Sequence, residues 1–512
     1  MGIPRWSVSL AAVLLGACFV FRNVAVETTP TGEGTTVMSR ARVHLVDGTT
    51  VVYPNGFSVN GGTIQGVGAR YDLFLAAKGE AGRVPVDSVV GVESYRQSTN
   101  MAATLGVSTL ATAVGLFASA ALAVAIFGSC PTIYSDSAGA QFLEAEGFSY
   151  SIAPIFEMRD VDRLRAQPGP DGVLRLEIRN EALETHYLNH FEVLEVAHLP
   201  EEVVVPDPAG HALALRAGYA PLAATDRSGR DVLPLIARAD SLRYEAPRTL
   251  LATATEQDFD DFIDLDVPVP AGADSVAVGL RLRNSLLTTV LFYDLMLADR
   301  GAAAVDWIGR DLENLGPAVT LGRWAHDAMG LSVSVRDGNG YRQVARVPNV
   351  GPIAWKDVAV MVPVTARPVM RVRLASVIDD WRIDRVTVAA GWRRPEVVTR
   401  PITRVLRADG SADAAALAGL RGPDDRYLET GPGDRFTAEF GGADVAGGSA
   451  KTYLLGSQGY YIEWLRRSWL APKQPVAAFE PGRPALFEAV RRWRMAQDTL
   501  EQRFYTTRIP VR

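Results

Sequence analysis

Three residues with metal-ligand side chains, Glu184, His186 and His190, lie within seven positions of one another. On a helix, His186 and His190 would share a face, and imidazole is a common metal ligand. The surrounding residues alternate as in a strand, where four residues separate two side chains by roughly 13 Å. A loop at 180–187 could still bring Glu184 close to a histidine. These three residues are weak candidates for metal ligands. The sequence predicts no particular metal and no other cofactor.

A run of five aspartates could supply oxygen ligands to calcium, which takes about six to eight oxygens. The run lacks the glycine and the glutamate that an EF-hand loop needs at fixed positions. Apolar residues lie between the acids, which favours a half-buried segment with one solvated face. The aspartates are Asp258, Asp260, Asp261, Asp264 and Asp266.

Acid–base and nucleophilic catalysis have few candidate groups. Asp379 or Asp380 could pair with Asp384 as glycosidase carboxylates, but the intervening residues have the pattern of a strand entry, which favours a structural role. Ser457 lacks the glycine two positions before it that a nucleophile elbow requires. The sequence has no phosphate loop and no dinucleotide fingerprint. The catalytic residues, if any exist, are unknown from the sequence.

The densest aromatic cluster is a candidate surface for a ligand or a partner. Its rings could stack on sugars, contact another protein or lie at a membrane interface. Packing in the protein interior is the alternative, and the one favoured. The rings are Tyr460, Tyr461, Trp464 and Trp469.

The N-terminus has the features of an export signal. Arg5 precedes the apolar run 8–15, which is too short to span a bilayer. The next residues, Leu-Gly-Ala-Cys ending at Cys18, resemble the lipobox of bacterial lipoproteins. That resemblance implies lipid attachment at Cys18. The alternative is an uncleaved membrane anchor over residues 6–21.

A second apolar stretch, residues 101–128, contains no charged residue. As a helix it would be roughly 42 Å long, more than the hydrocarbon core requires. We expect a transmembrane or membrane-embedded segment, with a helix buried in a soluble core as the alternative. One full crossing would place residues 22–100 and 130–512 on opposite sides of the membrane, so a non-crossing arrangement is favoured.

Composition limits the classes of function. The chain has 512 residues, room for about three domains. Its net charge of −6 gives no reason to expect nucleic acid. Two cysteines, one of them the candidate lipid site, exclude a disulfide framework and a cysteine-rich metal site.

Alternating apolar residues predict strands along most of the chain, for example at 174–178 and 276–282. Asp337-Gly338-Asn339-Gly340 predicts a hairpin, and apolar residues at helical spacing predict helices within 286–329 and near the C-terminus. The predicted fold is mainly β and multidomain. Its expected parts are a signal (1–18), a tether (19–40), a small β-barrel or sheet domain (41–98), an apolar membrane-associated helix (99–129), a β-sandwich-like domain (130–285), a helical insert (286–330), a second β block (331–405) and a β/α C-terminal region with a C-terminal helix (406–512).

Several short motifs resemble those of a group of uncharacterised bacterial lipoproteins. The first is Cys130-Pro131-Thr132-Ile133-Tyr134-Ser135 after the apolar stretch, and the others lie at 180–187, 284–287, 291–294, 355–357 and 381–384. The resemblance covers residue 40 to the end. It implies a signal, a small β domain, an apolar helix and a large β-rich region outside the cytoplasm, and it supplies no catalytic residues.

These observations predict a non-enzymatic, membrane-anchored protein of the cell envelope, acting as a scaffold or binding module. The expected partners are membrane lipid and an envelope protein or glycan, and no nucleic acid. The alternative is an extracytoplasmic hydrolase or carbohydrate-binding protein that acts on envelope glycans.

Overall fold

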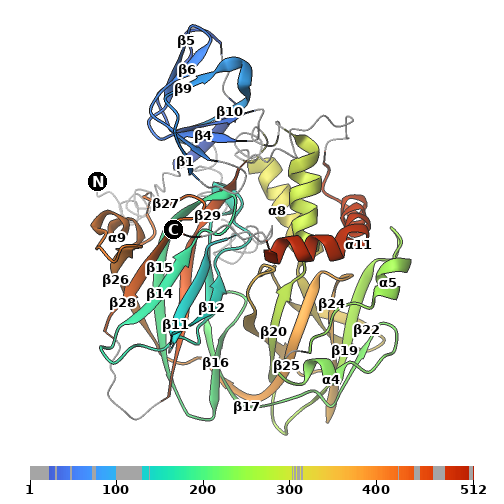
Figure 1. Ribbon diagram of the computed structural model, residues 1–512. Helices are drawn as coiled ribbons and strands as arrows, with labels where there is room; N and C mark the ends of the chain where they lie inside the picture. The colour runs from blue at the N-terminus through green and yellow to red at the C-terminus, as the bar shows by residue number, and fades with distance from the viewer. Residues whose placement is uncertain are drawn as a thin grey trace, which may run out of the picture.

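The structure is a computed structural model in which strands predominate (Figure 1). It describes residues 22–28, 32–45, 49–71, 77–99, 130–137, 139–240, 242–301, 304, 307, 312, 315–424, 426–442, 450–464, 479–506 and 511. Cys18, the apolar stretch at 101–128 and Trp469 lie outside these residues. Within the described ranges, every helix is too short or too polar to cross a lipid bilayer. The predicted mainly β, multidomain fold class is confirmed.

The N-terminal unit, residues 22–99, contains two sheets around one small core. The core is made by alternate residues of short strands, among them Val43, Val51 and Ile64, each fully buried. The six-stranded sheet has the order β1 (Arg22–Thr28), β10 (Val89–Thr99), β3 (Ala41–Leu45), β4 (Thr50–Tyr53), β7 (Ala69–Tyr71) and β8 (Ala77–Glu80). The four-stranded sheet has the order β2 (Thr36–Val37), β5 (Phe57–Asn60), β6 (Thr63–Gln65) and β9 (Arg83–Pro85).

The large β unit, residues 130–198 and 397–463, is a 9-stranded sheet that folds over itself. Its order is β12 (Ala140–Glu146), β11 (Thr132–Ser137), β14 (Leu174–Arg179), β28 (Arg435–Phe440), β26 (Val397–Arg407), β15 (Glu184–His198), β29 (Ala450–Glu463) and β13 (Met158–Arg163), with β27 (Leu428–Thr430) paired to β15. β26 joins the two halves, because Val397–Pro401 pair with β15 and the residues from Ile402 pair with β28 across a bulge. Leu176 and Leu455 from opposite halves therefore share one core.

A β-sandwich is inserted between β15 and β26. Val196 pairs with Val397, so the chain leaves the large sheet after β15 and returns beside it. The first sheet has the order β16 (Glu202–Pro206), β17 (Ala212–Tyr219), β25 (Trp381–Arg393), β20 (Ser275–Asn284) and β23 (Lys356–Pro363). The second has the order β18 (Ala223–Asp226), β19 (Asp260–Pro268), β24 (Val369–Val377), β21 (Leu331–Asp337) and β22 (Gly340–Val347).

The core of this inserted sandwich follows the predicted alternation. Val276, Val278 and Leu280 of β20 are buried and meet Val333 and Val372 of the facing sheet. The expected hairpin forms, with Asp337 opposite Gly340 in the β21–β22 pair. The strands expected as one block at 130–285 are divided between the large sheet and both sheets of the sandwich, because strand pairing depends on contacts distant in sequence.

Helices cover the end of the inserted sandwich, as Figure 1 shows for α8 and α11. Their apolar faces share one core, to which the large β unit contributes Tyr461 and Ile462. The predicted C-terminal helix is present and buries Ala489, Val490 and Trp493. The helices of this layer are α5 (Arg248–Thr253), α6 (Leu287–Thr289), η3 (Val290–Leu297), η4 (Ala298–Arg300), α8 (Leu315–Met329) and α11 (Arg483–Thr506).

Candidate functional site

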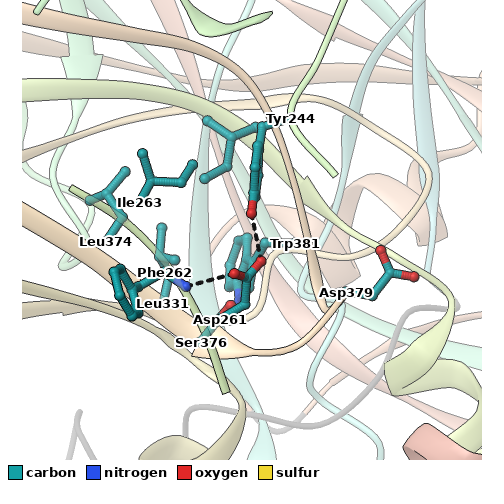
Figure 2. Close-up of a pocket in the computed structure, with 10 residues that line it drawn as sticks. Tyr244, Asp261, Phe262, Ile263, Leu331, Leu374, Ser376, Asp379 and Trp381 are labelled. Carbon is teal, nitrogen blue, oxygen red and sulfur yellow. Dashed lines mark hydrogen bonds between the residues drawn. The ribbon is translucent and has the colours of Figure 1, made fainter. Parts of the chain in front are cut away.

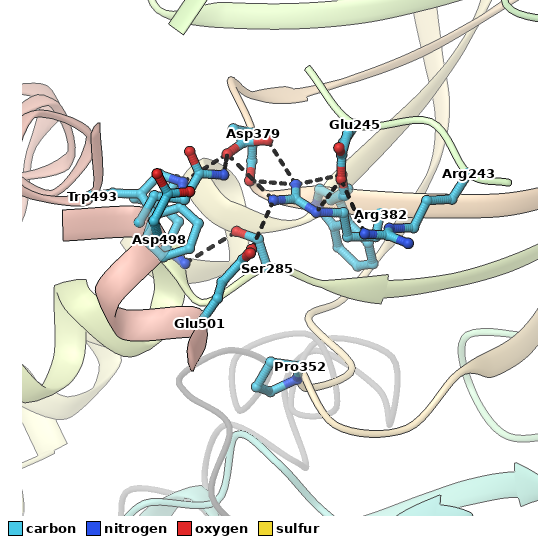
Figure 3. Close-up of polar contacts among 12 residues, drawn as sticks. Arg243, Glu245, Ser285, Pro352, Asp379, Arg382, Trp493, Asp498 and Glu501 are labelled. Atoms are coloured by element: carbon cyan, nitrogen blue, oxygen red, sulfur yellow. Dashed lines mark hydrogen bonds and ion pairs between the residues drawn. The ribbon is translucent and has the colours of Figure 1, made fainter. Parts of the chain in front are cut away.

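The turn between β24 and β25 holds a buried group of charged side chains beneath α11 (Figure 3). Arg382 is 2% exposed, and its Nη1 lies 2.7 Å from Asp379 Oδ1. Glu245 and Glu501 approach the same guanidinium at 3.4 Å and 3.6 Å. Asp379 has a left-handed backbone (φ 61°), which aspartate tolerates better than most residues.

α11 is joined to this turn by directed hydrogen bonds. Trp493 Nε1 donates to Asp379 Oδ2 at 2.7 Å, and Gln497 Nε2 donates to the same oxygen at 3.2 Å. Burial disfavours the charge of Arg382, but the nearby carboxylates outweigh it, so the pKa of Arg382 is raised. The group fastens the C-terminal helix to the sandwich.

Asp380 and Asp384 are held in different ways. Asp380 is fully buried, beside the side chain of Asn284. Burial raises its pKa well above the usual range although Arg382 opposes the shift. Asp384 lies 3.0 Å from Arg281 Nε. With Asp379 bound to Arg382, the arrangement agrees with the structural role that the sequence favours for these acids.

A small recess opens at the end of the inserted sandwich beside this turn (Figure 2). Tyr244 Oη donates to Asp261 Oδ2 at 2.7 Å, and the amide of Phe262 donates to the other oxygen at 2.8 Å. Burial raises the pKa of Asp261 to about 6, because apolar walls that include Leu374 surround the carboxyl. Asp379 also lines the recess, but its carboxylate is already bound by Arg382, Trp493 and Gln497.

The other acids of the calcium candidate lie in or just before strand β19 and pair with arginines. Asp264 and Asp266 each lie 2.8 Å from an arginine nitrogen, of Arg373 and Arg371 respectively. Asp260 lies 3.3 Å from Arg483 Nη2, and Asp258 pairs with Arg227. Because a strand sends alternate side chains to opposite faces, Asp261 is buried while Asp260 is exposed. The calcium hypothesis is not supported, since the arginines already neutralise the run.

The three metal candidates all lie on β15, but their side chains do not meet at one point. His186 Nε2 lies 2.6 Å from Glu184 Oε1, and both side chains are fully buried. Burial lowers the pKa of His186 to about 3, so the ring is neutral. His190 contacts the carbonyl oxygen of Leu420 at 3.2 Å instead. In the part of the chain that the structure describes, no three His, Cys, Asp or Glu side chains are placed to hold a metal ion.

The aromatic cluster is buried, so the hypothesis of an exposed ring surface is wrong for its three described members. Tyr460 stacks on Tyr187 with ring centroids 4.6 Å apart, and the hydroxyl of Tyr461 donates to a backbone carbonyl 3.1 Å away. Trp464 is 3% exposed, and its Nε1 donates to Thr185 Oγ1 at 2.9 Å. Ser457 is also buried, and its hydroxyl has no hydrogen-bond partner.

Sequence reasoning missed the interunit seam, the buried polar contact between the large β unit and the inserted sandwich. Lys356 Nζ of β23 lies 2.6 Å from Asp160 Oδ1 and 2.9 Å from Asp162 Oδ1 of β13. Burial raises the pKa of Asp162 to about 7, while the two acids raise the pKa of Lys356. The sequence contains one signal for this contact, because Lys356 is one of only four lysines in the chain. The seam comprises these three residues with Cys130, Glu146 and Gly351.

The side-chain carboxylate of Glu146 holds a loop of the inserted sandwich by binding backbone amides of that loop. Its Oε2 accepts hydrogen bonds from the amides of Ile353 at 2.7 Å and Ala354 at 3.2 Å, and the Sγ of buried Cys130 lies 3.5 Å from Oε1. Burial raises the pKa of Glu146 to about 7. A Cβ on Gly351 would lie 2.4 Å from Glu146 Cδ, and the residue has φ 93°, so glycine is needed there.

No protein-family model matches the chain, and no curated protein matches it in sequence. Among solved structures, an alpha-xylosidase of Xanthomonas citri is similar at 10% identity and a TM-score of 0.16, over 84% of this chain and 38% of the xylosidase. An allantoicase is similar at 12% identity and a TM-score of 0.18, over 52% of this chain and 93% of the allantoicase. The chain thus spans well under half of the xylosidase. TM-scores of this size carry no argument about fold or activity.

Proposed function

We propose that the protein is a non-enzymatic, membrane-anchored protein of the cell envelope that acts as a scaffold or binding module. The lipobox-like residues before Cys18 and the likeness of its motifs to a lipoprotein group support the anchor and the location. The membrane lipid is then one partner, and an envelope protein or glycan is the other.

One observation carries the non-enzymatic part of the proposal. The ionisable side chains that the sequence nominates for chemistry are bound by other groups of the protein, for example Asp261 by Tyr244 and Asp384 by Arg281. Arg382 and Asp379 fasten α11, and arginines neutralise the acids of β19. A group held in a buried ion pair is poorly placed to bind substrate or transfer a proton, because breaking the pair leaves an uncompensated buried charge.

Two experiments test the proposal. In bacterial cells supplied with labelled palmitate, the wild-type chain and Cys130→Ser should both be labelled, whereas Cys18→Ser should lose the label. Unlabelled wild type would contradict the lipid anchor.

The purified protein should then be incubated with peptidoglycan and envelope polysaccharides, beside Asp261→Asn, Asp379→Asn and Asp384→Asn. We expect no turnover by any of the four proteins. Turnover by the wild type that one substitution abolishes would overturn the non-enzymatic function and favour the glycan hydrolase.

A further inference from the structure

The register of the β1–β10 pair joins the two ends of the N-terminal unit. Arg22 lies opposite Thr99, and Asn23 lies opposite Ser98, in an antiparallel pair that continues to Thr28 opposite Glu93. Arg22 follows Cys18 by four positions, and the apolar stretch begins two positions after Thr99. The candidate lipid site and the apolar stretch are therefore attached to the same end of one two-stranded ribbon.

The N-terminal unit is docked on the large β unit through Trp464. The guanidinium of Arg42 lies 4.7 Å from the centre of the Trp464 ring, and Tyr71 meets that ring edge-on at 6.3 Å. Arg42 is 1% exposed and pairs with Glu93 at 3.4 Å. Burying a charged side chain between two units is costly unless the charge is paired, and Glu93 supplies the counter-charge here. Arg40 and Glu429 add an ion pair across the same contact.

The residues that follow the apolar stretch are packed together with the N-terminal unit. Cys130, two positions after the stretch, is 2% exposed and packs in one core with Ile152 and Phe156. β1 lies against η2 (Pro154–Phe156), which contributes Phe156 to that core. The residues before and after the stretch are thus tied to each other by described contacts as well as by the stretch itself.

From these contacts we infer that residues 22–99 and 130–506 lie on the same side of the membrane to which the protein is attached. The inference rests on the proposed membrane anchor and deepens it. A segment that crosses a bilayer once would place its flanks on opposite faces, about 30 Å apart. The 28 residues from 101 to 128 are too few for two crossings of about 20 residues each.

The test uses two reporter variants, each of which adds one cysteine at an exposed position: Met38→Cys in the N-terminal unit and Met495→Cys on α11. The native residues are 85% and 66% exposed. Spheroplasts with an intact inner membrane are treated with a membrane-impermeant maleimide before or after lysis. The wild-type chain is the matched control, because Cys130 is buried. Both purified variants must first react with the maleimide in their native state.

We expect both reporters to react before lysis and to the same extent. Reaction of one reporter before lysis and of the other only after it would overturn the inference. If both react only after lysis, the shared side stands, but the extracytoplasmic location in the proposed function is wrong.

Discussion

The core of the inserted sandwich and the interunit seam are both buried, but different forces hold them. The core consists of aliphatic side chains such as Val278, Leu280 and Val360 in regular alternation along facing strands. The seam instead places Lys356 between Asp160 and Asp162, and Glu146 against the backbone amides of Ile353 and Ala354. Burial of apolar area tolerates small shifts, whereas a buried charge requires its partner at hydrogen-bonding distance. The core therefore provides stability within one unit, and the seam fixes how two units meet.

Removal of the cation of the seam should give the largest effect. Lys356→Ala leaves two buried carboxylates without their counter-charge, and we expect a loss of about 3–5 kcal/mol in the free energy of unfolding. Urea unfolding followed by tryptophan fluorescence measures the loss. Lys356→Arg keeps the charge and should retain more of the stability than the alanine variant. An alanine variant as stable as wild type would show that the seam has no such role.

A cavity in the core should cost nearly as much, but without dependence on charge. Leu280→Ala removes a side chain that is 2% exposed, and we expect a loss of about 2–5 kcal/mol in the free energy of unfolding. The loss should be the same at pH 5.5 and pH 8. Leu222, at 59% exposure, provides the control, since Leu222→Ala should change the unfolding midpoint little. Equal losses at the two sites would contradict the assigned core.

Of the two regions compared, the seam should respond to pH. Because the folded-state pKa of Glu146 is about 7 and its ordinary value is 4.5, the folded protein holds this proton more tightly. The protonated Glu146 therefore stabilises the folded state fully below about pH 4.5. This contribution, on the order of 3 kcal/mol in the free energy of unfolding, is lost as the pH rises through 7.

Unfolding midpoints between pH 4.5 and 8 measure this contribution. Glu146→Gln should flatten the curve over that range. Asp171→Asn is the matched control, because Arg175 lowers the pKa of Asp171 to about 2, outside the range. An unchanged slope in Glu146→Gln would contradict the raised pKa of Glu146.

An exposed ion pair should have the smallest effect. Arg248 lies 2.6 Å from Asp498, but both side chains are more than 70% exposed. Water and salt screen such a pair, so Arg248→Ala should leave the urea midpoint unchanged. If Arg248→Ala shifted the urea midpoint as much as Lys356→Ala, the exposed ion pair would contribute as much stability as the buried one, and the expectation would be wrong.

The two regions also differ in how well a sequence predicts them. Alternation at 276–282 and the Asp337–Gly340 turn are local signals, and the structure contains both the strand and the hairpin. The C-terminal helix is likewise local, since its buried residues recur at helical spacing. These elements could be predicted because strand and helix periodicity places the apolar face without knowledge of the partner.

The candidate site could not be predicted in the same way. Trp464 reaches its environment only because β29 pairs with β15, and strands of the N-terminal unit pack against it. Two partners of Asp379, Trp493 and Gln497, lie on α11, more than 110 positions away. The neighbouring residues in the sequence do not show whether an aromatic ring lies on the surface or is covered by a distant unit. They also do not show whether an acid binds a ligand or pairs with a distant arginine.

The insertion between β15 and β26 has a consequence for the order in which the protein is made. Residues 199–396 are synthesised complete before β26, β28 and β29 exist, so the sandwich can fold while the large sheet lacks strands. β29 is the last strand made, yet it lies between β15 and β13 in that sheet. We therefore expect chains that end before residue 450 to contain a protease-resistant sandwich beside an open, protease-sensitive sheet, which limited proteolysis of such truncations would measure.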